Sequence, residues 1–235
     1  MNKNIKDDAE KLINFFCTYS LKNIFDNDEF MINYKTVHKN ALGYMVIFSE
    51  IEKQNKQNII FDEKSIFYLK ESVSDVLQSV FAWVNGAYKG ADLLLRSSIE
   101  NFNKSIIGNS NISVYEEKSV YKIFEILDEM PQYKIVVSNE TFSSTLHRIY
   151  AELCKSTHTA TSADMDHVTA LNLLPKYEEK KSKEYVKIFV TLIDTYLGYF
   201  LANHKEIINK MFITNKDIVY DVLPKSIIQD IIKNN

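Results

Sequence analysis

Arginine is scarce in this chain, which makes each arginine a candidate for a specific chemical role. Of the 28 basic residues among 235, only Arg96 and Arg148 are arginine. A lysine cannot reproduce the rigid, planar fork of donors that a guanidinium group presents. Arg96 has a carboxylate one helical turn away on each side, Asp92 and Glu100. These charges form either a solvated ion-pair ladder, which contributes only about 0.2–0.5 kcal/mol per pair, or a partly enclosed group that requires partners.

A second polar group ends in His158, on a helix predicted in the second half of the chain. The histidine ring titrates near neutral pH, and the carbonyl end of a helix favours its protonated form. His147 and Cys154 lie with it at the edge of the buried face of this helix, whereas Arg148 and Glu152 are expected to point away as an i,i+4 pair. For a lone histidine of this kind, helix capping or hydrogen bonding in the core is the simplest role.

Metal and cofactor chemistry lacks its usual signatures in this sequence. Cys154 and His158 are one turn apart, as two zinc ligands can be, but His147 and His167 would have to complete the site and no paired cysteine spacing supports it. The chain has no Gly-x-Gly-x-x-Gly, no Walker loop, no Gly-x-Ser-x-Gly and no His-Glu-x-x-His. We therefore expect no metal and no cofactor.

Composition and periodicity predict the elements that position these residues. Only five glycines and three prolines occur, fewer than turn-rich all-β folds use, and apolar residues recur at helical spacing through most of the chain. The fold class predicted is all-α, a multi-helix bundle with long helices. The predicted helices cover residues 5–25, 30–51, 62–108 (kinked or divided at Asn85-Gly86), 119–130, 143–158, 182–212 and 224–232.

The most hydrophobic run, residues 188–202, is predicted to be a buried core helix. It is short for a membrane span and carries Asp194 near its middle, so we expect no membrane insertion. Asp194 and His204 are interpreted as ordinary face residues of this helix. The two cysteines are far apart and no secretory leader is recognisable, which favours the reducing cytoplasm. The formal net charge of −3 gives no overall basic field, so binding of nucleic acid would need a local patch.

Two segments resemble signatures of the HEPN-like proteins of prokaryotic defence and toxin–antitoxin loci. Residues 86–101 (GAYKGADLLLRSSIEN) look like a helix that reads glycine, aromatic residue, then Leu-Arg-small-small-aliphatic-Glu. Residues 149–158 (IYAELCKSTH) are similar to a second signature, which reads Tyr, two residues, Leu, a small residue, then His about four positions on. The two segments occur in this order on predicted helices, and the resemblance covers about 70 residues at the centre of the chain.

The resemblance implies a helical bundle that often dimerises and cleaves RNA without a metal ion, using an arginine, four to six variable residues and a histidine. This chain departs from that pattern, because nine residues separate Arg148 from His158 and the two lie roughly 80° apart around the helix. Arg96, on the neighbouring helix, would have to supply the guanidinium group.

On this resemblance the catalytic residues would be Arg96, His158, Glu100 and Tyr150. His158 would transfer a proton at the 2′-hydroxyl or the leaving oxygen, and Arg96 would stabilise phosphorane charge. Glu100 and Tyr150 would orient them. The alternative is that the same four side chains form a structural hydrogen-bond network between two core helices. If the protein is an enzyme, we expect a cleft where Arg96 and His158 converge, with lysines at its rim. If the four residues form a structural network, we expect their side chains to be buried and fully hydrogen-bonded.

Two functions therefore stay open. The first is a HEPN-like protein of a bacterial antiphage defence or toxin–antitoxin system, acting as a metal-independent RNase on RNA. The second is a non-catalytic helical accessory subunit, which docks through an apolar terminal helix onto a larger nuclease or ATPase of a defence complex. Either would work as a homodimer or with a partner protein of such a complex. The expected organisation is a helical arm over 1–58 that packs on the core, a HEPN-like bundle over 59–212 and a C-terminal amphipathic helix over 213–235.

Overall fold

The computed structural model describes residues 3–158, 165 and 167–233, with the backbone alone for residues 3 and 156–158. These residues form eleven α-helices: α1 (Lys3–Thr18), α2 (Lys22–Phe25), α3 (Asp28–Asn55), α4 (Glu63–Val84), α5 (Tyr88–Gly108), α6 (Val120–Glu129), α7 (Phe142–His158), α8 (Glu179–Asn203), α9 (Lys205–Lys210), α10 (Ile213–Val222) and α11 (Lys225–Lys233). The strands described are the two-residue pair β1 (Val136–Val137) and β2 (Glu140–Thr141), which are antiparallel. The predicted all-α bundle is confirmed.

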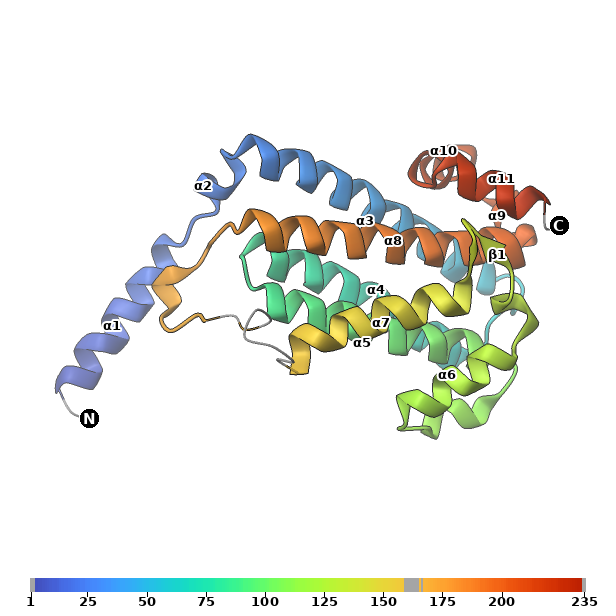
Figure 1. Cartoon of the computed structure of the whole chain (residues 1–235), viewed down its shortest axis with the longest axis horizontal. Coiled ribbons are helices and arrows are strands. Elements are labelled where there is room, and N and C mark those ends of the chain that lie inside the picture. Colours follow the sequence, from blue (N-terminus) through green and yellow to red (C-terminus); the bar gives the residue numbers. More distant parts are fainter. Residues whose placement is uncertain (1–2, 159–164, 166, 234–235) are drawn as a thin grey trace.

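Five long helices, α3, α4, α5, α7 and α8, lie side by side and form the body of the molecule (Figure 1). Their inward faces carry the large side chains that solvent does not reach, among them Tyr44, Trp83, Phe102, Phe189 and Tyr196. Local signals fix where several helices begin: the side chain of Asn27 accepts a hydrogen bond from the backbone N–H of Phe30, and that of Asp62 from Ser65.

Three buried tyrosine hydroxyl groups in this core are paired with serines on neighbouring helices. The oxygen–oxygen distances are 2.9 Å for Tyr44 and Ser72, 2.9 Å for Tyr185 and Ser79, and 3.1 Å for Tyr196 and Ser98. Each pair satisfies two polar groups that would otherwise be costly to bury. These pairs therefore specify how α3, α4, α5 and α8 are aligned.

The predicted helix over 62–108 is divided into α4 and α5 by a tight turn at Asn85 and Gly86. Gly86 has a φ of 76°, in the region that favours glycine. A Cβ atom at this position would lie only 2.2 Å from the carbonyl oxygen of Lys176. The turn thus needs glycine both for its backbone conformation and for the close approach of the segment that leads into α8.

Helix α8 is the apolar helix predicted from residues 188–202. By length and composition it could cross a membrane, but 72% of its most apolar stretch is buried inside the molecule. The prediction of one helix over 182–212 is wrong, because the helix ends at Asn203 and α9 begins after His204. The ring of His204 packs on Phe61 with centroids 5.0 Å apart, and the change of direction buries Ile207. The C-terminal segment over 213–235, for which one amphipathic helix was predicted, contains two helices, α10 and α11.

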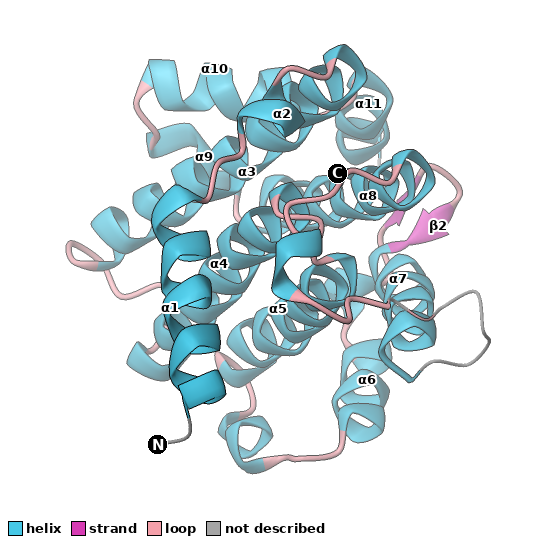
Figure 2. Ribbon diagram, turned by 90° about the vertical axis from the view of Figure 1, so that its left-hand side faces the viewer, coloured by secondary structure: helices cyan, strands magenta, loops and turns pink. Residues whose placement is uncertain are grey.

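The N-terminal and C-terminal helices lie at opposite ends of the bundle (Figure 1). Helix α1 projects away from the body (Figure 1), and Figure 2 shows the molecule from the end that bears α1. Helix α3, by contrast, contributes side chains such as Val37 and Ile47 to the core. The first 58 residues thus contain a projecting helix and a central bundle helix. At the other end, α10 packs on α3, while α11 packs on α8 and β1.

Candidate functional site

Three of the four predicted site residues come together where α5 and α7 pack against each other. The Nε of Arg96 donates to the hydroxyl oxygen of Tyr150 at 2.8 Å, and that hydroxyl group donates to Oε1 of Glu100 at 2.8 Å. The Nε of Arg96 lies 3.4 Å from the same carboxylate oxygen. The guanidinium carbon also lies 5.2 Å from the centre of the Tyr150 ring, within the range of a cation–π contact. We call Arg96, Glu100 and Tyr150 the interhelix triad.

The surroundings of Arg96 and Tyr150 keep both side chains protonated near neutral pH. Burial and the neighbouring Glu100 raise the pKa of the Tyr150 hydroxyl. Burial alone would lower the pKa of Arg96, but the hydrogen bond to Tyr150 and the nearby charges keep it above its ordinary value. Arg96 therefore stays charged and Tyr150 stays neutral. The Arg96 side chain is 22% exposed, so the triad is only partly accessible to solvent.

The fourth predicted residue, His158, is the last residue of α7. Its side chain lies outside the described part of the structure, so the expected approach of His158 to Arg96 stays a prediction. His158 comes eight positions after Tyr150 in the helix, which corresponds to about 12 Å along the axis.

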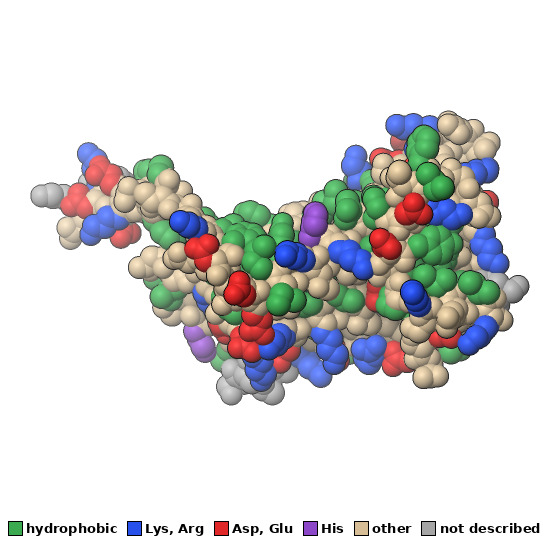
Figure 3. All heavy atoms as spheres, turned by 90° about the horizontal axis from the view of Figure 1, so that it is seen from above, with side chains coloured by type: hydrophobic (Ala, Val, Ile, Leu, Met, Phe, Trp, Pro, Cys, Tyr) green, Lys and Arg blue, Asp and Glu red, His purple; other side chains and the backbone are tan. Residues whose placement is uncertain are grey.

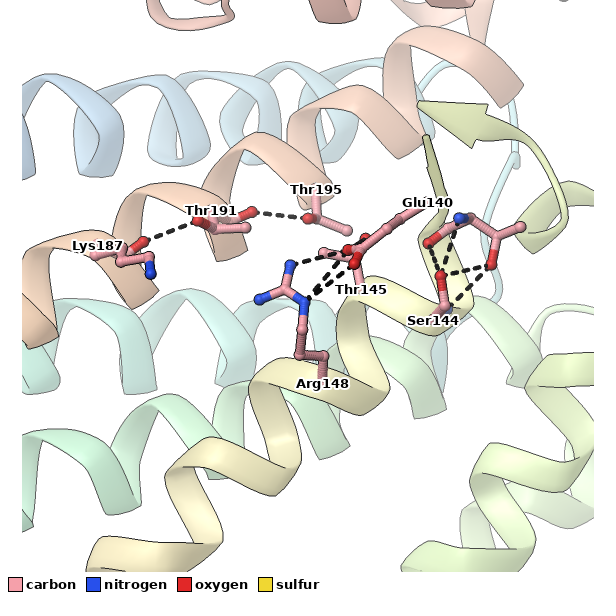
Figure 4. A network of polar contacts seen from close by, with 8 residues as sticks. Glu140, Ser144, Thr145, Arg148, Lys187, Thr191 and Thr195 are labelled. Atoms are coloured by element: carbon pink, nitrogen blue, oxygen red, sulfur yellow. Dashed lines mark hydrogen bonds and ion pairs between the residues drawn. The ribbon is translucent and has the colours of Figure 1, made fainter. Parts of the chain in front are cut away.

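Arg148 points away from the buried face of α7, as expected, but its main partner is Glu140 rather than Glu152. Arg148 forms a bidentate ion pair with Glu140, in which Nη2 of Arg148 lies 2.9 Å from Oε2 of Glu140 and Nε lies 3.3 Å from Oε1 (Figure 4). Helical spacing could not reveal this partner, because Glu140 lies on β2 rather than on α7. The turn that leads into β2 has positive φ at Ser138 and Asn139, as two-residue hairpin turns require. The hydrogen bond from Arg148 lowers the pKa of Glu140.

The pair formed by Arg148 and Glu140 lines a cavity of about 630 Å³, which we call the α7–α8 cavity. Its walls come from the β1–β2 hairpin, the first half of α7, the middle of α8 and the start of α11. Figure 4 shows the Arg148 and Glu140 side chains directed toward each other beside the threonines of α8. The polar lining of the α7–α8 cavity consists chiefly of Glu140, Thr145, Arg148, Thr191, Asp194 and Thr195.

Asp194 is the unusual member of this lining. It is only 8% exposed, and its Oδ1 has no hydrogen-bond partner among the described residues. Burial raises its pKa to about 7, against the opposing effect of Lys39 on α3. Our interpretation of Asp194 as an ordinary face residue is therefore wrong. The sequence signal was present, since a lone acid in the run 188–202 has no helical neighbour of opposite charge within that run.

The structure describes the side chains of only some of the residues that were considered as zinc ligands. The Nε2 of His147 lies 3.2 Å from Oδ2 of Asp128 on α6, and its ring packs on Phe124. Within residues 3–155, 165 and 167–233, no three His, Cys, Asp or Glu side chains gather as metal ligands would. His204, also interpreted as a face residue, is largely buried, and burial lowers its pKa.

No protein-family model, curated protein or solved structure matches this chain. The features of the molecule that bear on its function are therefore the interhelix triad, the α7–α8 cavity and the projecting helix α1.

Proposed function

We propose that this protein is a non-catalytic helical interaction subunit, in which α1 inserts its apolar face into a groove on a partner protein. The observation that supports this proposal is the exposure of α1. Its large apolar side chains, Ile5, Leu12, Ile13 and Phe16, are between 39% and 61% exposed. Apolar residues at such exposure on one helix usually mark an interaction surface.

The spacing of these side chains suits a helix that lies in a groove. Ile5, Leu12, Ile13 and Phe16 follow one another at intervals of seven, one and three residues, which places them on one face of α1. Helices that bind grooves present anchors at this spacing. Near its end, the arm is tied to the bundle by a hydrogen bond from the Tyr19 hydroxyl group to Oδ1 of Asn85.

The polar side of α1 favours a protein partner over a membrane surface. Helices that bind anionic membranes carry a strongly basic polar face. Seen from above, the arm shows acidic and basic side chains interspersed (Figure 3). The charged residues of α1 are three bases and three acids: Lys3, Lys6, Asp7, Asp8, Glu10 and Lys11. Such a face fits the polar rim of a protein groove.

The interhelix triad is consistent with this proposal. Arg96, Glu100 and Tyr150 satisfy one another between α5 and α7, as a structural network would. The likeness of residues 86–101 and 149–158 to HEPN-like proteins supports a setting in bacterial antiphage defence or a toxin–antitoxin system. The partner in that setting would be a larger nuclease or ATPase.

The experiment places a photo-crosslinking amino acid at Ile13, on the apolar face, or at Lys11, on the opposite side of the same helix. In the native host we expect one protein to be captured from position 13 and not from position 11. With that protein purified, Phe16→Glu should weaken binding at least tenfold, because burying a phenylalanine contributes about 1.5–3 kcal/mol. Lys11→Glu should stay within twofold. Equal capture from both positions, capture of this chain alone, or no capture contradicts the proposal.

A metal-independent RNase is the second candidate, supported by one observation. Arg96 lies on α5, next to the helix that carries His158. Its side chain is partly exposed and is held by Glu100 and Tyr150. If the protein is an RNase, His158→Ala and Arg96→Lys should each lower cleavage of RNA in the presence of EDTA by at least about 100-fold. Arg148→Lys, which alters the other arginine, should leave cleavage unchanged. Full cleavage, or full toxicity in cells, by His158→Ala excludes this function.

A further inference from the structure

We propose that the α7–α8 cavity binds a small organic cation, an ammonium group on an apolar stem, with the ammonium group held by Asp194. The proposal is independent of the docking of α1, since the cavity lies between the β1–β2 hairpin, α7, α8 and α11. Three properties of the cavity support the proposal: the hydrogen-bonding capacity of the lining, the charge of the lining and the apolar part of the wall.

The inner lining of the cavity offers acceptors and few free donors. The hydroxyl of Thr191 donates to the carbonyl of Lys187 at 2.9 Å, and that of Thr195 to the carbonyl of Thr191 at 2.7 Å. The hydroxyl of Thr145 donates to Glu140 at 3.1 Å. With their hydrogens committed in this way, the three threonines can only accept a hydrogen bond from a ligand.

The charge of the lining favours a cation over an anion. Arg148 is the basic residue of the lining, and Nε and Nη2 of its guanidinium group are already bonded to Glu140. Without displacing Glu140, an anion could reach only the side of the guanidinium group that faces away from it, and it would also meet Asp194. An ammonium group, with three donors and no acceptor, matches a lining rich in acceptors. The donors that remain belong to exposed residues: Nη1 of Arg148, which is not bonded to Glu140, and the side chains of Ser138, Asn139 and Ser226.

Asp194 supplies the specific attraction. The residue is only 8% exposed and its buried Oδ1 lacks a hydrogen-bond partner among the described residues, a state that costs free energy until a donor arrives. The charged groups around it are Lys39 on α3, and Glu140 and Arg148 on the opposite side of the cavity. No lysine or arginine of the described residues makes an ion pair with Asp194, so its position is open to a cation from outside.

The remaining wall suits an apolar stem. The apolar part of the lining consists of Val137, Phe142, Pro224 and Ile227. A volume of about 630 Å³ accommodates a short alkyl chain and its ammonium group. The ligand is thus defined as a small aliphatic amine.

The experiment is an NMR titration of the ¹⁵N-labelled protein with three probes of equal length: n-hexylamine, hexan-1-ol and hexanoate. Hexylamine should bind at least tenfold more tightly than hexan-1-ol, with shifts centred on α7, α8 and the β1–β2 hairpin, and hexanoate should bind most weakly. Asp194→Asn should remove the preference for the amine. Glu184→Gln, which removes an exposed carboxylate from the same helix, should keep it.

A second measurement uses pH and does not depend on any variant. An ammonium ion binds the ionised carboxyl group, so binding must displace the proton that buried Asp194 holds at low pH. The amine itself stays charged over this range. Affinity for hexylamine should therefore rise about tenfold between pH 6 and pH 8. Equal affinity for hexan-1-ol, tighter binding of hexanoate, or an affinity for hexylamine that does not rise with pH would overturn the proposal.

Discussion

The hydroxyl group of Tyr150 on α7 accepts a hydrogen bond from Arg96 and donates one to Glu100, so it bonds to two opposite charges that both lie on α5. An ion pair on α5 alone would contribute only a few tenths of a kcal/mol. The tyrosine adds two hydrogen bonds to charged groups in a partly buried place, where such bonds are stronger. At the scale of single residues, the interhelix triad therefore aligns α5 with α7, whether or not it also acts in catalysis.

Removing the Tyr150 hydroxyl tests this alignment. Tyr150→Phe leaves Arg96 and Glu100 without their shared partner, and we expect the free energy of unfolding to fall by about 1–3 kcal/mol. Tyr121→Phe, at a well-exposed tyrosine on α6, should change it by no more than about 0.5 kcal/mol. Urea unfolding at neutral pH measures both. Equal effects of the two substitutions would mean that the interhelix triad contributes nothing to stability.

Asp194 makes a separate prediction about stability and pH. Its pKa is about 7 in the folded protein against 3.8 for an ordinary aspartate, so the folded state holds a proton that the unfolded state has lost. The stabilising contribution is complete below pH 3.8 and is lost as the pH rises through 7. Relative to Asp194→Asn, the wild-type protein should lose roughly 2–3 kcal/mol between pH 5 and pH 8. Urea unfolding at both pH values measures this difference, and parallel pH profiles of the two proteins would refute it.

At the scale of elements, the turn between α4 and α5 depends on Gly86. An alanine there must adopt a positive φ and also meet the carbonyl oxygen of Lys176, so Gly86→Ala should lower the free energy of unfolding by about 2 kcal/mol or more. Gly90 offers a matched control, since it lies in α5 and its Cβ position meets nothing closer than Ala82 at 4.0 Å. Gly90→Ala should stabilise by about 0.5–1 kcal/mol. Thermal unfolding distinguishes the two, and a neutral Gly86→Ala would show that the turn tolerates a side chain.

Helices were predictable from the sequence where the apolar period was long and the ends carried capping residues. Asn27, Asp62 and Ser119 each begin a helix close to the predicted position. The end of α8 was not predictable, because neither glycine nor proline marks His204 and the break depends on packing against Phe61, more than 140 residues earlier in the chain. Local sequence patterns hold no information on such a contact.

The residues of the candidate site also divide into those that helical periodicity revealed and those that it did not. Arg96, Glu100 and Tyr150 could be found because each lies on a strongly periodic helix, and two such helices in one bundle had a fair chance of meeting. The partnership of Arg148 with Glu140 was hidden, since a two-residue strand after a turn gives almost no periodic signal. The α7–α8 cavity joins segments from four parts of the chain, and no local pattern predicts that.

At the scale of the whole molecule, the two ends of the chain differ in what they contribute to stability. Helix α1 leaves most of its apolar face exposed, whereas α11 buries Ile231 and packs on α8 and β1. Apolar area removed from water is the main source of folding free energy, so only the second of these helices should be needed for a stable bundle. The projecting helix is instead free to supply binding energy to a partner.

Two truncations compare these ends directly. Deleting residues 1–18 should change the Tm of the bundle by no more than a few degrees, because the deleted helix buries little surface. Deleting residues 225–235 exposes the neighbouring apolar side chains of α8 and should lower the Tm by more than about 5 °C. Circular dichroism follows both transitions, and the helical signal at low temperature verifies that each truncated protein still folds. If the loss of α1 destabilised the protein as much as the loss of α11, the arm would be part of the folded core, and its apolar face could not be reserved for a partner.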